Sequence, residues 1–253
     1  MERREEMTEF TVRLADVPVR IRAIHQSMRR FLQDYLSEEE PLITIEICQE
    51  DIDREREKSA AAREKEKAPP QDYSAAYLET LAIYRKLAVQ LIDRDILLFH
   101  GSVIAVDGEA YLFTASSGTG KSTHTRLWRE AFGERAVMIN DDKPLLLVGE
   151  DSVLAYGTPW SGKHRLGGNR SAPLKALCML SRASENRIEG ISLTEAFPGL
   201  LQQCFLPTDA PRMEKVLCLL ERLGRTVRLY RLGCNMDPEA AMVSYRGMQE
   251  ESK

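Results

Sequence analysis

The feature that most constrains this chain is a loop at residues 115–122 with the sequence Ala-Ser-Ser-Gly-Thr-Gly-Lys-Ser. It fits the Walker A phosphate-loop pattern, with alanine instead of glycine at the first position. A loop of this kind binds phosphate when a strand leads into it and a helix leaves it, because the N–H groups that face the anion belong to the turn and to the helix N-terminus. The pattern therefore predicts an α/β chain organised around strand, loop and helix.

The residues on both sides of the loop are typical of these elements. Residues 103–106 and 110–113 are apolar, and Asp107-Gly108 between them favours a tight hairpin turn. After the loop, apolar residues at helical spacing predict a helix over residues 123–132. The loop thus stands in the context that phosphate binding requires.

Each residue type in the loop has a physical role. Gly118 and Gly120 permit positive φ and close approach of the backbone to an anion. Lys121 can reach the β and γ phosphates of a nucleotide, and the Ser122 hydroxyl can join the coordination of Mg²⁺. The alternative is a flexible Ser/Gly turn with a surface lysine. The predicted nucleotide-binding residues are Ser117, Gly118, Thr119, Gly120, Lys121, Ser122 and Thr123.

Two adjacent aspartates follow the next apolar run. Asp141 and Asp142 come after residues 136–139, so they are expected at the carboxyl end of a strand, the edge at which α/β sheets bind ligands. Phosphoryl transfer needs one carboxylate for the metal and one for the acceptor, and neighbouring side chains on an extended backbone point opposite ways. The alternative is a polar turn leading into Lys143-Pro144.

Two further features are candidates for the same site. His100, at the head of the hairpin, is placed to meet the transferred phosphate, although a lone histidine is more often structural. Residues 156–170 are rich in glycine and carry four basic residues, which is typical of a loop that closes over phosphate or acceptor, or of an ordinary solvated loop. Lys163 and Arg165 are its candidate substrate-binding residues.

The rest of the chain suggests three parts. Residues 1–48 predict a small α+β segment, and residues 49–70 a charged linker or exposed helix that ends at two prolines. Residues 71–253 form the predicted catalytic domain, opening with a helix whose apolar stripe includes Tyr77 and Leu81. Near its end, Asp209 and Pro211 predict a helix start and Gly224 the end of that helix.

Composition and charge exclude several classes. The chain has 253 residues with 35 Lys+Arg against 39 Asp+Glu, a net charge of -4, so it lacks the basic surface of a nucleic-acid binder. It has no apolar run of the roughly 20 residues that a membrane span needs, and residues 1–10 hold six charges rather than a signal peptide's apolar core. We therefore expect a cytoplasmic protein with no membrane partner. The five cysteines are widely spaced and predict neither disulfides nor a zinc site.

Over about residues 97–147 the chain resembles the catalytic domain of HPr kinase/phosphorylase and, more distantly, the ATP-dependent phosphoenolpyruvate carboxykinases. The resemblance rests on His100-Gly101, the hairpin, residues 117–123 and Asp141-Asp142. It implies a mixed sheet with flanking helices, ATP as donor and Mg²⁺ as cofactor. It also implies that Asp141 is the base that activates a serine hydroxyl and that Asp142 binds the metal, in a family whose members form homo-oligomers.

The segment at residues 157–163 also resembles that of the short HPr-kinase-like proteins, some of which phosphorylate a peptide serine. The predicted function is therefore a kinase that transfers phosphate from ATP to a hydroxyl of a peptide, a protein or a small molecule. One alternative is a nucleotide-binding sensor without turnover that docks through residues 50–67. The other is a carboxykinase-like lyase, although those enzymes are about twice as long.

Overall fold

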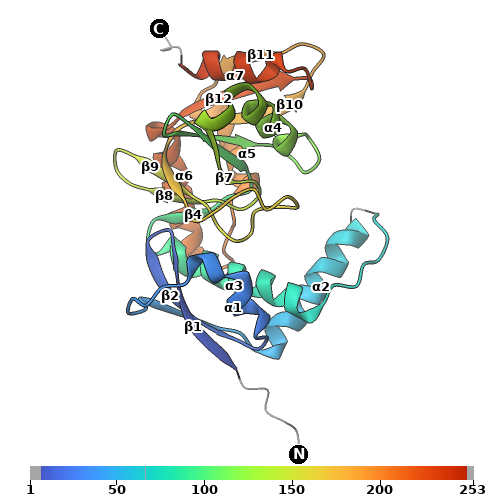
Figure 1. The fold of residues 1–253 in the computed structure, drawn as a ribbon, viewed down its shortest axis with the longest axis vertical. Helices are drawn as coiled ribbons and strands as arrows, with labels where there is room; N and C mark the ends of the chain where they lie inside the picture. Colours follow the sequence, from blue (N-terminus) through green and yellow to red (C-terminus); the bar gives the residue numbers. More distant parts are fainter. Residues whose placement is uncertain (1–6, 66, 250–253) are drawn as a thin grey trace, which may run out of the picture. The chain divides into compact units, whose positions relative to one another are not determined.

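The computed structural model describes residues 7–65 and 67–249. Residues 1–6, residue 66 and residues 250–253, which belong to the predicted N-terminal segment, charged linker and catalytic domain, lie outside the described residues. The chain forms two compact units, Met1–Gln90 and Leu91–Lys253 (Figure 1). The sequence-based division at residue 71 assigned residues 71–90, which include most of the helix Ala75–Ile92, to the larger unit instead.

The first unit contains the predicted small α+β segment. Strands β1 (Thr8–Leu14) and β2 (Val17–Ala23) pair antiparallel across a turn in which Ala15 and Asp16 have φ of 48° and 62°. β3 (Ile43–Glu46) pairs parallel to β2, and the connection between them contains α1 (Ser27–Phe31) and a 3-10 turn.

The charged segment after it is helical. α2 (Gln49–Lys65) is exposed along most of its length, and α3 (Ala75–Ile92) follows it. Two buried carboxylates in the first turns of α2 join the two helices. Lys86 Nζ donates to Asp51 Oδ2 at 2.5 Å, and Arg85 Nε donates to Glu55 Oε2 at 2.8 Å. Ion pairs, which the charge-rich sequence of α2 supplies, therefore join α2 to α3.

The second unit is built on a mixed sheet with flanking helices, as predicted. The strand order is β4-β8-β9-β10-β6-β5-β7, and β12 pairs with β10 and with β11. β6, β10 and β12 run parallel, and β5 is antiparallel to both of its neighbours, so β7 also runs in the direction of β6. The strands are β4 (Ile96–Leu98), β5 (Ser102–Val106), β6 (Glu109–Thr114), β7 (Ala136–Asn140), β8 (Leu145–Val148), β9 (Val153–Tyr156), β10 (Ser171–Arg182), β11 (Arg187–Gly190) and β12 (Arg228–Cys234).

Helices cover both faces of the central strands (Figure 1). Along β6 the side chains alternate: Tyr111 and Phe113 pack with α4 (Lys121–Phe132) and α7 (Glu239–Gln249), whereas Leu112 packs with α5 (Leu193–Gln203) and α6 (Ala210–Thr226). Among the described residues, no helix combines the length and apolar character needed to cross a bilayer.

This topology brings four strand ends to one edge. The carboxyl ends of β6, β7, β10 and β12 lie together because these strands share one direction. The predicted phosphate loop follows β6, and the aspartate pair follows β7. In α/β sheets this is the edge where ligands bind.

A buried histidine lies between α4 and α7. His124 Nε2 is 3.0 Å from Ser244 Oγ, and the Trp128 indole N–H donates to the same Ser244 oxygen at 2.9 Å. Burial lowers the pKa of His124 to about 4, so the ring is neutral at pH 7.

We expect His124 to contribute to acid denaturation. Because its pKa is lower in the folded than in the unfolded protein, the unfolded state binds more protons between pH 6.5 and 4, and stability falls as pH falls through that range. The contribution is roughly 3 kcal/mol. Urea unfolding at pH 7 and pH 4 should show a smaller loss of stability for His124→Gln than for the wild type. An equal loss in both proteins would contradict the assignment.

Candidate active site

The loop between β6 and α4 turns through two glycines in the left-handed region of backbone conformation. Gly118 and Gly120 have φ of 76° and 124°, and a Cβ at either position would meet no atom within 4 Å. The space above the glycine backbone is therefore open to an anion. α4 begins directly after Gly120, so its positive end adjoins this space. The residues present thus fit the polyphosphate of a nucleotide.

Lys121 lies at the start of α4 with its side chain folded back on the loop. Its Nζ donates to the Ala115 carbonyl oxygen at 2.9 Å, and only 8% of the residue is exposed. Burial lowers the pKa of Lys121, while the nearby charges of Asp142 and Asp141 act in the opposite direction. Lys121 is therefore placed within electrostatic reach of both aspartates.

Asp141 is buried and oriented by a serine. Ser102 Oγ donates to Asp141 Oδ1 at 2.7 Å, and the hydroxyl of Thr125 on α4 lies 3.1 Å from Ser102 Oγ. Ser102 can reach Asp141 because β5 begins at the edge where β7 ends. A hydrogen-bonded chain therefore links the first turns of α4 to the Asp141 carboxylate.

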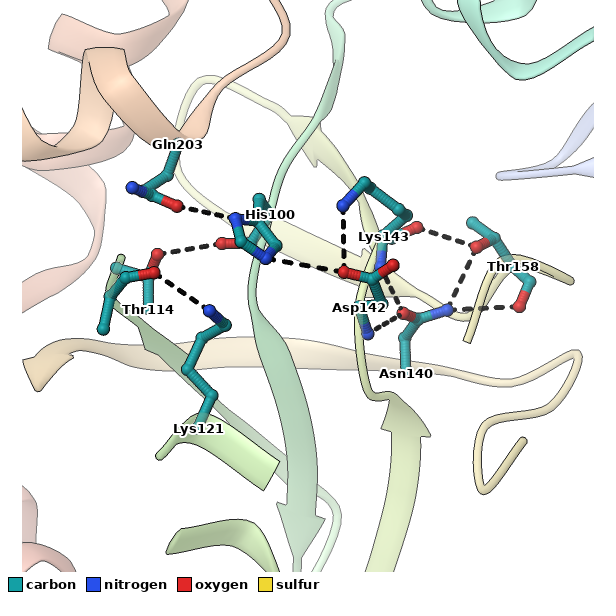
Figure 2. Close-up of polar contacts among 9 residues, drawn as sticks. His100, Thr114, Lys121, Asn140, Asp142, Lys143, Thr158 and Gln203 are labelled. Carbon is teal, nitrogen blue, oxygen red and sulfur yellow. Dashed lines mark hydrogen bonds and ion pairs between the residues drawn. The ribbon is translucent and has the colours of Figure 1, made fainter. Parts of the chain in front are cut away.

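Asp142 lies in a different environment, between a lysine and a histidine (Figure 2). Lys143 Nζ donates to Asp142 Oδ1 at 2.9 Å, and His100 Nε2 is 3.5 Å from the same oxygen. His100 Nδ1 is 2.8 Å from Gln203 Oε1 at the end of α5. Burial, together with the charges of Lys143 and Lys121, lowers the pKa of His100 to about 4. His100 is therefore a neutral side chain at pH 7.

The aspartate pair lies on a bend, not on the extended backbone that the sequence predicted. Asn140 Oδ1 accepts from the backbone N–H groups of Asp142 and Lys143 at 2.8 and 2.7 Å. Its Nδ2 donates to the carbonyl and hydroxyl oxygens of Thr158 at 3.1 and 3.0 Å (Figure 2). An asparagine that closes a turn on its own backbone in this way gives the two carboxylates different surroundings.

The glycine-rich loop at residues 156–170 has a fixed base and an exposed tip. Gly157 N–H donates to the Arg170 carbonyl at 2.8 Å, and Lys143 N–H donates to the Trp160 carbonyl at 3.1 Å. Trp160 is buried, whereas Lys163 and Arg165 are exposed. The two ends of the glycine-rich loop are therefore packed against the bend that carries the aspartates.

Gly157 and Gly168 provide a matched pair for testing this packing. A Cβ on Gly157 would lie 1.9 Å from the Gly168 carbonyl oxygen and 2.5 Å from that of Ile139, whereas one on Gly168 would come no closer than 3.7 Å to the Arg170 side chain. We expect Gly157→Ala to lower the free energy of unfolding by about 2–3 kcal/mol and Gly168→Ala to leave it nearly unchanged. Urea unfolding of both variants measures this, and similar values for the two would contradict it.

Two residues were predicted to bind Mg²⁺. In the part of the chain that the structure describes, no group of three or more His, Cys, Asp or Glu side chains could hold a metal ion. Mg²⁺ in nucleotide sites needs only one or two carboxylates and takes its remaining ligands from phosphates and water. Ser122 is exposed beside the loop, and the Asp142 side chain is 36% exposed. These donors fit a nucleotide-bound magnesium ion.

The structure brings most of the predicted site residues to one sheet edge and adds partners that the sequence did not reveal. The added partners are Ser102, Asn140, Lys143 and Gln203. Ser102 directly follows His100-Gly101, so its position at the start of the strand could have indicated that it belongs to the site. Gln203 was missed because the helix that carries it, α5, was not predicted.

The comparisons with known proteins add little at this point. No family model matches the chain, and no curated protein matches it in sequence. One solved structure with a detectable likeness is the Hpr(Ser) kinase/phosphatase from Coxiella burnetii. Its TM-score is 0.34 and its identity 9%, over 60% of this chain and 93% of that one. This likeness is too distant to indicate a function.

Proposed function

We propose that this protein is an ATP- and Mg²⁺-dependent kinase that phosphorylates a hydroxyl group, most simply a serine of a peptide or protein. The observation that carries the proposal is the arrangement of Asp141. It is a buried carboxylate, oriented by Ser102, at the same sheet edge as an open phosphate loop and its lysine. A general base next to a phosphate-binding loop is the minimum that phosphorylation of a hydroxyl requires.

In the proposed reaction, the acceptor oxygen attacks the terminal phosphorus of ATP. Its bond to phosphorus forms while the bond from phosphorus to the bridging oxygen breaks, which leaves ADP, and the hydroxyl proton passes to Asp141 Oδ2. Gly162 lies beside this oxygen, since a Cβ built there would be 3.6 Å away, so the carboxylate is bordered on this side by a residue without a side chain. Lys121 and the loop N–H groups stabilise the negative charge of the transferred group.

Ser122 and Asp142 would hold the magnesium ion. When bound, the ion neutralises charge on the phosphates, a contribution common to phosphoryl-transfer enzymes. Lys143 now occupies Asp142 Oδ1 and would have to release it. Lys163 and Arg165, exposed on the loop tip, are proposed to contact the acceptor.

The test is transfer of labelled phosphate. The protein is incubated with Mg²⁺, terminally labelled ATP and a lysate of its source, and the labelled products are identified by mass spectrometry. Label on serine supports the proposal. ATP binding without any transfer would favour a sensor, and release of carbon dioxide from oxaloacetate would favour a carboxykinase-like lyase.

Ser102→Ala should lower the rate of transfer about tenfold, because Asp141 would lose the hydrogen bond that orients it. The effect should disappear in an Asp141→Asn background, where no base remains to be oriented. Single-turnover rates of the two single variants and the double variant measure this coupling. Additive effects would mean that Ser102 acts elsewhere.

A further inference from the structure

A cavity of about 480 Å³ adjoins the phosphate loop on the side away from the aspartates. It is lined by the loop glycines and the first turn of α4, and by the residues that follow β10 and β12. The strand order β7-β5-β6-β10-β12 places Asp141 after β7, the loop after β6 and this cavity at β10 and β12. The loop thus separates the cavity from the proposed base.

The cavity has a defined wall. Arg182, at the end of β10, donates through Nη2 to the Gly118 carbonyl at 2.5 Å and so ties this wall to the loop. Asn235 is fixed by Nδ2 hydrogen bonds to the Ser184 carbonyl at 3.1 Å and to Asp237 Oδ2 at 2.8 Å. Met236, which is 76% exposed, adds an apolar thioether side chain to the lining.

One buried polar group of the lining has no partner. His124 lines the cavity and is 2% exposed, yet its Nδ1 has no hydrogen-bond partner within the described residues. The indole N–H of Trp128 lies 3.2 Å from His124 Nε2, and an indole nitrogen only donates. The same N–H donates to Ser244 Oγ at 2.9 Å, and this hydroxyl lies 3.0 Å from His124 Nε2, so among the described residues Nε2 has partners and Nδ1 has none. A buried ring nitrogen without a hydrogen-bond partner is uncommon and costly, so it calls for a partner from outside the chain.

We propose that His124 determines donor specificity: its Nδ1 forms a hydrogen bond with a polar atom of the nucleoside of ATP, which occupies this cavity. The inference rests on the proposed function, because the loop must hold the phosphates. The terminal phosphate must face Asp141, so the nucleoside leaves the loop in the opposite direction, toward β10 and β12. The volume lies within the range of small-molecule sites. Inorganic tripolyphosphate, which has no nucleoside, would leave the cavity and His124 unused.

The experiment compares ATP with tripolyphosphate on wild type and His124→Gln, by calorimetric titration with Mg²⁺. Glutamine keeps a side-chain amide that can hydrogen-bond with Ser244 and Trp128, and it removes the ring nitrogen Nδ1. We expect His124→Gln to weaken ATP binding about tenfold and to leave tripolyphosphate binding unchanged. Equal effects on both ligands, or no effect on either, would overturn the role of His124 while leaving the kinase proposal in place. Failure of both ligands to bind the wild type would overturn both.

A second measurement needs no substitution. Cys234 lines the cavity and is half-buried, whereas Cys48 and Cys218 are exposed elsewhere and serve as internal references. ATP should slow the alkylation of Cys234 by N-ethylmaleimide several-fold, and tripolyphosphate should not, with the two reference thiols unaffected. Equal protection of Cys234 by both ligands, or none by ATP, would overturn the placement of the nucleoside.

Discussion

Asp141→Asn is expected to lower the rate of phosphate transfer by about 10²- to 10⁴-fold, the usual contribution of a positioned general base. Asparagine has nearly the same shape and still offers an oxygen to Ser102 Oγ, which donates to Asp141 Oδ1 at 2.7 Å. It cannot accept the proton of the acceptor hydroxyl. The substitution therefore removes the chemistry and leaves the local packing in place.

Nucleotide affinity provides the internal check on this variant. The loop glycines and Lys121, which hold the phosphates in the proposed site, are unchanged in Asp141→Asn, so ATP should bind with an affinity close to that of the wild type. Asp151→Asn, at an exposed position after β8, is the matched control and should transfer phosphate normally. A wild-type rate for Asp141→Asn, measured in single turnovers with labelled ATP, would show that Asp141 is not the base.

The local order around the loop could be predicted because short-range rules determine it. The hairpin at Asp107-Gly108 forms with φ of 53° and 85°, and α4 ends at Gly133, as the turn and capping residues indicate. The same holds for the start of α6, where the Asp209 side chain accepts from the backbone N–H of Arg212. These features depend on residues within a few positions of each other.

Predictions that depended on tertiary packing were less accurate. Gly224 was expected to end α6, but the helix continues to Thr226. A Cβ at Gly224 would lie 2.3 Å from Leu193 Cδ1, so this glycine permits close packing of α6 on α5 rather than a turn. Likewise, Tyr77 was expected in the apolar stripe of α3 but is 46% exposed, while Leu78 is fully buried. Helical spacing identifies the helix but not which of two adjacent faces is covered.

Sequence-based prediction of the site was limited in the same way by contacts between distant segments. The aspartates, the loop and His100 could be proposed from the chemistry of their residue types, but their partners come from distant segments. Gln203 contacts His100 across 103 positions in the chain, from a helix that sequence reasoning did not find. Ser192 and Glu195 form a capping box at its start, a signal that was present, whereas Pro198 inside the helix argued against it.

Lys121→Ala should have the second large effect, a loss of about 10²- to 10³-fold in transfer rate together with weaker ATP binding. The Lys121 side chain is nearly buried, and its charge is the cation that follows directly on the loop glycines. Among the described residues, Lys121 Nζ donates only to the Ala115 carbonyl oxygen, at 2.9 Å. The substitution therefore removes one hydrogen bond from the fold. The main loss should therefore appear when phosphate binds.

Two control variants separate charge from position. Lys215→Ala removes a lysine of α6 that bonds the Asp93 carbonyl at 2.9 Å, and it should leave ATP binding and transfer unchanged. Lys121→Arg keeps the charge but places a larger, planar group in a space that is 8% exposed, so it should not restore the wild-type rate. Full activity in Lys121→Arg would mean that charge alone suffices. In a phosphate-binding loop, the lysine at this position contacts the phosphates. Unchanged ATP affinity in Lys121→Ala would therefore show that this loop does not hold the nucleotide's phosphates.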